Sequence, residues 1–194
     1  MCIFIAQYSY MRKVLIIYAH PLEQKSRVNQ HLIKAVSGLA NVSVNHLYEN
    51  YPDFYINVKH EQGLLLKHDV IIWHHPFYWY SAPALLKEWF DLVLEHGFAY
   101  GREGNALKGK FALNCITTGG SEETYQEGGL NRYPIENYLL PFNQSAHLCK
   151  MRYLPPFVVN GVHLLGKGGI DECVRQYMNL VLDLRDNEIV YHKK

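Results

Sequence analysis

The chain has 194 residues, of which 48% are hydrophobic, with 19 basic and 18 acidic side chains. This length suits one well-packed domain better than two. A formal charge of +1 gives no strong positive potential to attract the phosphate backbone of a nucleic acid, so nucleic acid is not an expected partner. The four cysteines form no CxxC pattern, which favours a reducing, cytoplasmic setting over a disulfide-rich secreted one.

The N-terminal stretch, MCIFIAQYSYM, precedes a strand that begins after Arg12-Lys13. We expect residues 1–12 to form an extension outside the fold, with an added edge strand as the alternative. Residues 13–194 are then a single domain. No apolar run reaches the roughly 20 residues that span a bilayer.

Five apolar runs predict strands. Val14–Tyr18 and Val70–Trp73 are continuously apolar, which is typical of parallel strands covered on both faces. Val42–Leu47 is shorter and more polar, as an outer strand would be. Phe111–Ile116 returns to apolar residues, and Phe157–Val159 is a weaker fifth candidate after two prolines.

Helical spacing of apolar residues between these runs predicts helices over Ser26–Ser37, 57–67, Pro83–Glu95 and Asp171–Leu184. Strands alternating with helices indicate a doubly wound α/β fold, with a parallel five-stranded sheet in the flavodoxin-like order 2-1-3-4-5 and helices on both faces. In such a fold ligands bind outside the carboxyl ends of the strands, at the switch point between strands 1 and 3.

The loop after the first strand, AHPLEQKSRVN, has the residues for holding one phosphate. Ser26 stands where a helix cap would, and Arg27 and Asn29 lie in the opening turn, so a hydroxyl, a cation and an amide accompany the free N–H groups of a helix start. The alternative is an ordinary cap with solvated neighbours. His20 is equally compatible with a hydrogen-bonded loop residue.

The loops after the third and fourth strands suit a flat ring. Phe77, Tyr78, Trp79 and Tyr80 follow Pro76 in a row, and large aromatic side chains can stack on a ring or, alternatively, plug the core or a subunit interface. Alternate residues of the row point different ways, so both interpretations can hold.

The TTGG sequence at the end of the fourth strand allows backbone N–H groups to approach a ligand closely. No GxGxxG, P-loop or GxSxG motif is present, which argues against a dinucleotide site of Rossmann type, a nucleoside triphosphatase and a serine hydrolase. A phosphate site beside a ring site leaves flavin mononucleotide, FMN, as the expected ligand.

These loops also carry a family resemblance. YAHP with SRVN, then HPFYWYSAPALLKEWFDLVLEHGFAYG, then TTGGSEETY, resemble the flavodoxin-like NAD(P)H:quinone reductases. LYENYPDF, LNRYP and CKMRYLPPF are similar to the cytoplasmic ancillary proteins of glutathione-regulated potassium-efflux systems, over about residues 13–160. The resemblance implies a homodimer that passes hydride from NAD(P)H through flavin to a quinone or related acceptor.

Carried over position by position, the resemblance implies that the phosphate and ribityl chain are held by His20, Ser26, Arg27, Val28 and Asn29. By the same resemblance, the ring is bordered by Pro76, Phe77, Tyr78 and Trp79, and its polar edge bonds Thr117, Thr118, Gly119 and Gly120. Tyr125 matches the family's active-site tyrosine. Asn131 stands where the characterised quinone reductases have histidine, and an amide cannot take up a proton near neutral pH.

The sequence is therefore compatible with two functions. One is an FMN-dependent NAD(P)H:quinone oxidoreductase, with FMN favoured over FAD because the chain is short. The other is a regulatory module that docks on the cytosolic face of a potassium/proton antiporter, where flavin serves structure or sensing. Tyr125 and the TTGG glycines favour the enzyme, and Asn131 favours regulation. A flavodoxin-like domain with no ligand at this rim is the remaining alternative.

Overall fold

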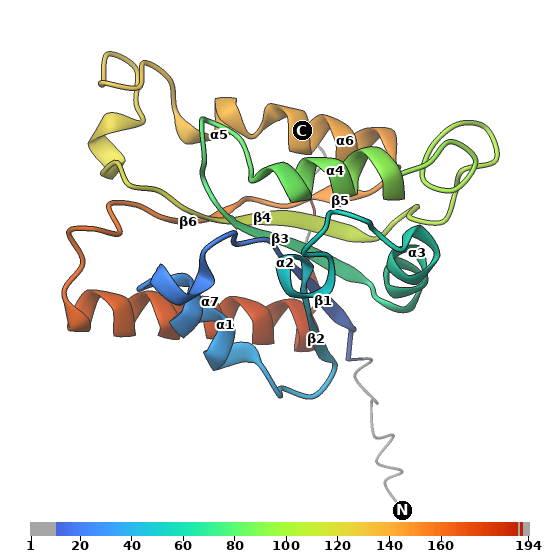
Figure 1. The fold of residues 1–194 in the computed structure, drawn as a ribbon, viewed down its shortest axis with the longest axis horizontal. Helices are drawn as coiled ribbons and strands as arrows, with labels where there is room; N and C mark the ends of the chain where they lie inside the picture. Colours follow the sequence, from blue (N-terminus) through green and yellow to red (C-terminus); the bar gives the residue numbers. More distant parts are fainter. Residues whose placement is uncertain (1–10, 190, 192–194) are drawn as a thin grey trace, which may run out of the picture.

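A computed structural model describes residues 11–189 and 191, and these build one parallel sheet with helices on both faces (Figure 1). The strand order is β2-β1-β3-β4-β5, with β6 also paired to β4, which confirms the predicted order. The strands are β1 Val14–Tyr18, β2 Val42–His46, β3 Val70–Pro76, β4 Phe111–Thr117, β5 Arg152–Tyr153 and β6 Phe157–Val159.

The fifth position of the sheet holds two short strands where the sequence predicted one. Arg152 and Tyr153 in β5 lie beside Phe111 and Ala112, whereas β6 lies beside the carboxyl-terminal half of β4. Pro155-Pro156 separates the two strands. Because proline has no backbone N–H to donate, two consecutive prolines interrupt the ladder there.

The helices are more numerous than predicted. The expected four correspond to α1, α3, α4 and α7, while the short segments α2, α5 and α6 were not foreseen. The bounds are α1 Asn29–Val36, α2 Leu47–Asn50, α3 Val58–Lys67, α4 Ala84–Val93, α5 Ile135–Tyr138, α6 Leu140–Leu148 and α7 Lys167–Asp186, with 3-10 turns η1 Glu23–Lys25 and η2 Glu122–Thr124. Predicted β2 ends one residue early because Leu47 begins α2.

Each face of the sheet has its own apolar core. On one face, Leu15 and Ile17 pack with α4 and α6 through residues such as Trp89 and Phe142. On the other, alternate residues of β1 pack against α1 and α7, as Figure 1 shows below the sheet. Because β1 and β3 are buried on both faces, only their ends are free to carry a ligand site.

The chain enters the sheet beside the last helix, where the Arg12 N–H donates to the carbonyl of Arg185 at 2.8 Å. Residues 1–10 lie outside the described residues, so the predicted extension and the single domain over 13–194 stay predictions. In the part of the chain that the structure describes, no helix has the length and apolar character needed to cross a membrane.

Candidate functional site

A cavity of about 410 Å³ lies at the carboxyl ends of β1, β3 and β4. It brings together residues from all three predicted loops. The predicted residues that line it are His20, Ser26, Arg27, Val28, Asn29, Pro76, Phe77, Tyr78, Thr117 and Gly119. Its position is the switch point of the sheet, where this class of fold binds ligands.

Ser26 and Asn29 form the polar floor of the cavity. Helix α1 begins at Asn29, and the Asn29 backbone N–H donates to Ser26 Oγ at 3.0 Å, so the serine provides a partner for the first N–H of the helix. The Asn29 side-chain Nδ2 donates to the same Ser26 Oγ at 3.0 Å. Since Ser26 Oγ accepts both bonds, its own hydroxyl hydrogen is left to donate toward a ligand.

A buried chain of hydrogen bonds holds Asn29 in place. Its Nδ2 also donates to Thr117 Oγ1 on β4 at 3.0 Å, and its Oδ1 accepts from His74 Nε2 on β3 at 3.0 Å. Burial keeps the pKa of His74 well below its usual value, so the ring is neutral and Nδ1 accepts from the Tyr177 hydroxyl of α7 at 3.1 Å. The network therefore joins two strands and two helices directly beneath the cavity.

His74 and Tyr177 were not predicted as part of the site. The sequence did contain one signal for this network: His74 lies inside an apolar strand, and a fully buried histidine ring needs hydrogen-bond partners. Both side chains are 0% exposed and lie out of reach of a ligand, so they act by positioning Asn29 and, through it, Ser26.

His20 closes the cavity on the side of β1. Its Nδ1 accepts from the Leu22 N–H at 3.2 Å, which leaves the proton of the neutral ring on Nε2. Burial lowers the pKa of His20 below its usual value. The neutral ring is therefore the form present around pH 7, and it offers one N–H donor.

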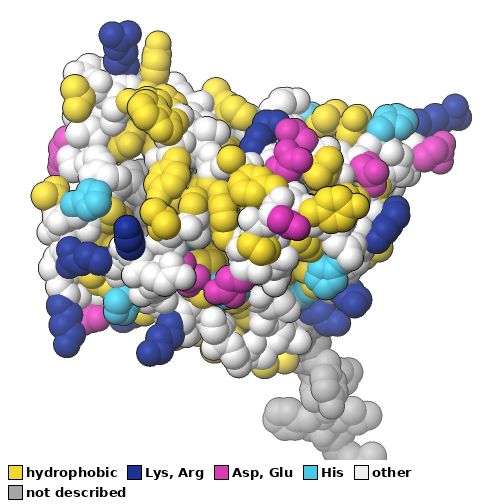
Figure 2. Space-filling view, in the orientation of Figure 1, with side chains coloured by type: hydrophobic (Ala, Val, Ile, Leu, Met, Phe, Trp, Pro, Cys, Tyr) yellow, Lys and Arg dark blue, Asp and Glu magenta, His cyan; other side chains and the backbone are white. Residues whose placement is uncertain are grey.

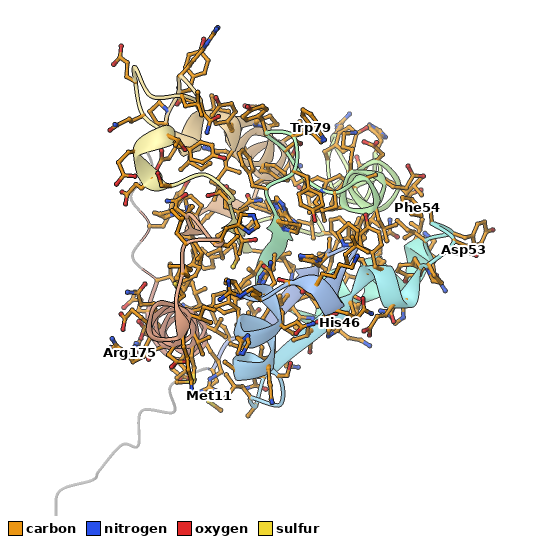
Figure 3. All side chains as sticks on the ribbon, turned by 60° about the vertical axis from the view of Figure 1, so that its left-hand side comes forward. Met11, His46, Asp53, Phe54, Trp79 and Arg175 are labelled. Atoms are coloured by element: carbon orange, nitrogen blue, oxygen red, sulfur yellow. The ribbon has the colours of Figure 1, made fainter. Side chains whose placement is uncertain are left out.

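The side chains of the aromatic row, Phe77 to Tyr80, point in different directions, as the sequence allowed. Phe77 is 9% exposed and, with Tyr78, lines the cavity. Trp79 is 92% exposed and stands outside the cavity, as Figure 3 shows at the edge of the loop after β3. Trp79 and Tyr80 have φ angles of +49° and +60°, and this left-handed turn directs the chain away from the cavity. A single chain thus does not bring Trp79 to the predicted ring position.

The TTGG loop folds tightly above the cavity. Gly119 lines it, while the Thr118 hydroxyl lies 2.7 Å from the Gly120 carbonyl and 2.9 Å from Asn160 Oδ1. A Cβ at Gly120 would lie 2.6 Å from Thr124 Oγ1 and 3.1 Å from Tyr125 Cε2. A side chain at Gly120 would therefore require Thr124 and Tyr125 to shift, because η2 and its neighbours return across this position.

Tyr125 follows η2 and lies next to the aromatic row and outside the lining of the cavity. Its ring contacts Phe77 edge to face at 5.8 Å between centroids, and burial raises the pKa of its phenol. Asn131 is engaged in structure: Nδ2 donates to Thr124 Oγ1 at 3.2 Å, and Oδ1 accepts from Tyr80 at 3.3 Å. The amide thus ties the loop that carries Tyr125 to the aromatic row.

Four lining residues were missed by the sequence analysis: Leu22, Lys25, Val162 and His163. Leu22 and Lys25 lie within the first loop. Val162 and His163 follow β6, and a Cβ on Gly119 would lie 3.6 Å from the His163 ring. The rule that ligands bind at strand ends, applied also to the fifth strand, would have found the last two.

The sequence matches the family described as having a flavodoxin-like fold over residues 12–181. The glutathione-regulated potassium-efflux system ancillary protein KefG of Pectobacterium carotovorum is 48% identical over 165 residues, which cover 85% of this chain and 90% of the relative.

Two solved structures are also similar. An NADPH-quinone reductase from P. pentosaceus has a TM-score of 0.81 at 32% identity, covering 92% of this chain and 99% of the other. General stress protein 14 of Treponema denticola, solved in complex with FMN, has a TM-score of 0.84 at 34% identity, covering 89% and 99%. The chain therefore belongs to the flavodoxin-like family and is a relative of the potassium-efflux ancillary proteins.

Proposed function

We propose that the cavity binds FMN and that the protein transfers hydride from NAD(P)H to a quinone or related electrophile. The observation that carries this proposal is the two-ended lining of the cavity: cations and a free hydroxyl at the start of α1, and an apolar and aromatic wall after β3. The FMN complex of the stress protein at 34% identity supports it.

The polar end fits a phosphate. Lys25 and Arg27 supply positive charge, Ser26 supplies a hydroxyl donor, and the first turn of α1 supplies N–H groups that have no partner within the helix. Arg27 is held by a bond from Nη2 to the Leu165 carbonyl at 3.2 Å. A single phosphate near two cations and a helix start is favourable because both the charges and the helix dipole oppose its charge.

The other end fits a flat ring. Pro76, Phe77 and Tyr78 border it, and the loop from Thr117 to Gly120 lies across from them. A bound flavin accepts a hydride from a nicotinamide and delivers it to a second substrate. The chain's part is to orient the ring, to exclude water with Phe77, and to present N–H donors from the glycine loop to the ring's polar edge.

Tyr125 is the proposed residue for substrate contact. It lies beside Phe77, and because burial raises its phenol pKa the hydroxyl stays protonated at neutral pH and can donate to an acceptor oxygen. Because an amide is not basic near neutral pH, no proton is taken up at Asn131, whose side chain instead bonds Thr124 and Tyr80.

A homodimer forms part of the proposal. A groove of about 370 Å³ runs between α4 and α6, lined by apolar residues that include Leu86, Phe90 and Phe142. Leu140 and Leu148 are 57% and 53% exposed nearby. Figure 2 shows hydrophobic side chains gathered over the upper half of the molecule, where Figure 1 places these helices. Such a surface is favourable to bury against a second copy.

A second candidate function is favoured by the relatives. The 48% identical KefG is named as an ancillary protein of a potassium-efflux system, so this chain is proposed to act at the cytosolic face of a potassium/proton antiporter, either beside reductase activity or chiefly as a regulator. Co-purification with the antiporter and potassium efflux after deletion test this role. An unchanged efflux rate together with failure to co-purify contradicts it.

Flavin binding is tested by titrating the flavin-free protein with FMN and, separately, with FAD. The readout is the quenching of flavin fluorescence. We expect FMN to bind more tightly. Ser26→Ala removes the hydroxyl donor and should weaken FMN binding about tenfold, the equivalent of one lost hydrogen bond to a charged group. Ser37→Ala, at the opposite end of α1, is the matched control and should leave the affinity unchanged.

The test of catalysis is stopped-flow mixing of the FMN-loaded protein with NADH or NADPH, and then with a quinone. Bleaching of the flavin absorbance followed by its recovery is the expected result. Flavin that remains oxidised under an excess of both nucleotides contradicts the enzyme proposal while leaving flavin binding intact. A protein that binds neither FMN nor FAD contradicts both.

A further inference from the structure

A second, smaller hollow of about 110 Å³ lies on the β2 side of His20. Glu23 from η1, His46 at the end of β2 and Glu49 from α2 line it, and one ligand atom from each lies within 4.8 Å of the others. Figure 3 labels His46 beside the blue segment that carries η1 and α1. In the described part of the chain, no lysine or arginine lines this hollow, so two carboxylates face each other without a neighbouring cation.

The fold brings these three groups together for local reasons. His46 pairs in register with Tyr18 across β1 and β2, and η1 follows directly after β1. Glu49 stands three residues after His46, one turn into α2, so both side chains project to the same side. The carbonyl of Glu23 accepts from Gln30 Nε2 at 2.6 Å and from the Ser26 N–H at 2.8 Å, which fixes η1 relative to α1.

Two buried polar atoms at this place make no hydrogen bond to any residue that the structure describes. His46 Nδ1 is buried and makes no hydrogen bond within the described residues, although Glu23 Oε2 lies 3.6 Å away and Glu49 Oε2 lies 3.8 Å away. The Tyr18 hydroxyl is likewise buried and unpartnered, on a side chain that is 2% exposed and lines the same hollow. Buried polar atoms without partners are rare, and each calls for a missing ligand or water.

We propose that Glu23, His46 and Glu49 hold a zinc ion, with Tyr18 beside it. An imidazole nitrogen with two carboxylates is a ligand set that zinc accepts, and it is unsuited to calcium and magnesium, which take oxygen ligands. With metal–ligand distances of about 2.0–2.2 Å, ligand atoms around a tetrahedral zinc lie about 3.4 Å apart. His46 Nδ1 lies 3.6 and 3.8 Å from the two carboxylates, and the carboxylate oxygens lie within 4.8 Å of each other, so rotation of the two glutamate side chains is needed to reach this arrangement.

The Tyr18 hydroxyl is a second, independent observation that supports a ligand between Glu23, His46 and Glu49. Its ring stands edge-on to the His46 ring at 5.3 Å between centroids. The Tyr18 hydroxyl has no hydrogen-bond partner among the described residues and its side chain lines the same hollow as Glu23 and Glu49, so it is placed to donate to a ligand bound there. A water on the zinc that accepts from Tyr18 would satisfy the hydroxyl and complete four ligands.

The proposed ion would tie η1 to β2 and α2. Because Glu23 is joined to Ser26 and Gln30, the ion would fix the loop that carries the phosphate end of the larger cavity. His20 lines both hollows, which makes them neighbours. Zinc binding itself rests on Glu23, His46 and Glu49 and does not require that flavin binds.

The experiment is a zinc titration of untagged, EDTA-treated protein in competition with a chromophoric chelator. We expect one zinc per chain. His46→Ala and Glu49→Gln should each weaken the affinity at least tenfold. Glu49 is 68% exposed, so its substitution tests the site without endangering the fold. His147→Ala, an exposed histidine at the end of α6, is the matched control and should change nothing.

X-ray absorption at the zinc edge supplies the second measurement. We expect only nitrogen and oxygen neighbours at about 2.0 Å. Sulfur neighbours at about 2.3 Å would place the zinc on cysteine and overturn the proposal. So would the absence of stoichiometric binding at micromolar zinc, or an affinity that His46→Ala and Glu49→Gln leave unchanged. The titration is run without flavin, so a failure of FMN binding cannot be mistaken for a failure of the zinc site.

Discussion

Asn29 is the residue on which the architecture of the larger cavity most depends. It is 3% exposed, and its side chain makes three hydrogen bonds, to Ser26, Thr117 and His74. Asn29→Ala removes all three and leaves His74 Nε2–H buried without a partner. Bonds of this kind contribute about 1 kcal/mol each, and an orphaned buried donor costs about 1–3 kcal/mol. Counting the bonds to Ser26 and Thr117 at about 1 kcal/mol each and the orphaned His74 donor at about 1–3 kcal/mol, we expect the free energy of unfolding to fall by about 3–5 kcal/mol.

Urea unfolding monitored by circular dichroism measures this loss of unfolding free energy. The matched control is Asn143→Ala, an exposed asparagine in α6, which should change the free energy of unfolding by no more than about 0.5 kcal/mol. The double variant Asn29→Ala with His74→Phe should cost less than the two single variants added together, because each substitution alone already breaks the bond between these two side chains. If Asn29→Ala costs less than about 1 kcal/mol, or the two substitutions are simply additive, the buried network does not hold the site.

Three further changes test other parts of the structure. Gly120→Ala should lower the melting temperature by several degrees, since its Cβ would meet Thr124 and Tyr125. Gly63→Ala, inside α3 with open space around it, should not lower it; equal changes in melting temperature contradict the packing argument. Burial lowers the pKa of His75 to about 4, so the unfolded state takes up a proton first as the pH falls. His75 alone should lower the free energy of unfolding by about 3 kcal/mol between pH 6.5 and 4, with buried His74 adding to the loss, and His75→Gln should make the curve shallower; parallel curves would refute it. Tyr125→Phe should slow quinone reduction about tenfold in stopped flow with unchanged FMN affinity, and an unchanged rate would remove Tyr125 from substrate contact.

The strands of the fold were predictable where burial dominates. Val14–Tyr18 was predicted with its exact bounds, because a strand covered on both faces is apolar at every position. Helix α6, LPFNQSAHL, was not foreseen, because its polar residues leave no clear apolar stripe and only Phe142 and Ala146 are buried. The split of the fifth strand depends on two prolines whose effect on the ladder appears only once the register is known.

The candidate site was predictable to the extent that strand ends define it. Ten predicted residues do line one cavity. Trp79 shows the limit, because a run of aromatic residues does not reveal that two successive left-handed φ angles turn one of them outward. His74 shows another, because its role rests on contacts with Asn29 and Tyr177, which lie far from it in the sequence.

The interrupted fifth strand also affects whether another chain can add a strand to the sheet. A sheet edge with a long row of unpaired N–H and C=O groups is a template on which another chain can add a strand and aggregate. Here that edge consists of strands two and three residues long with Pro155-Pro156 between them, so an incoming strand finds no continuous row of donors. This edge of the sheet therefore resists strand addition.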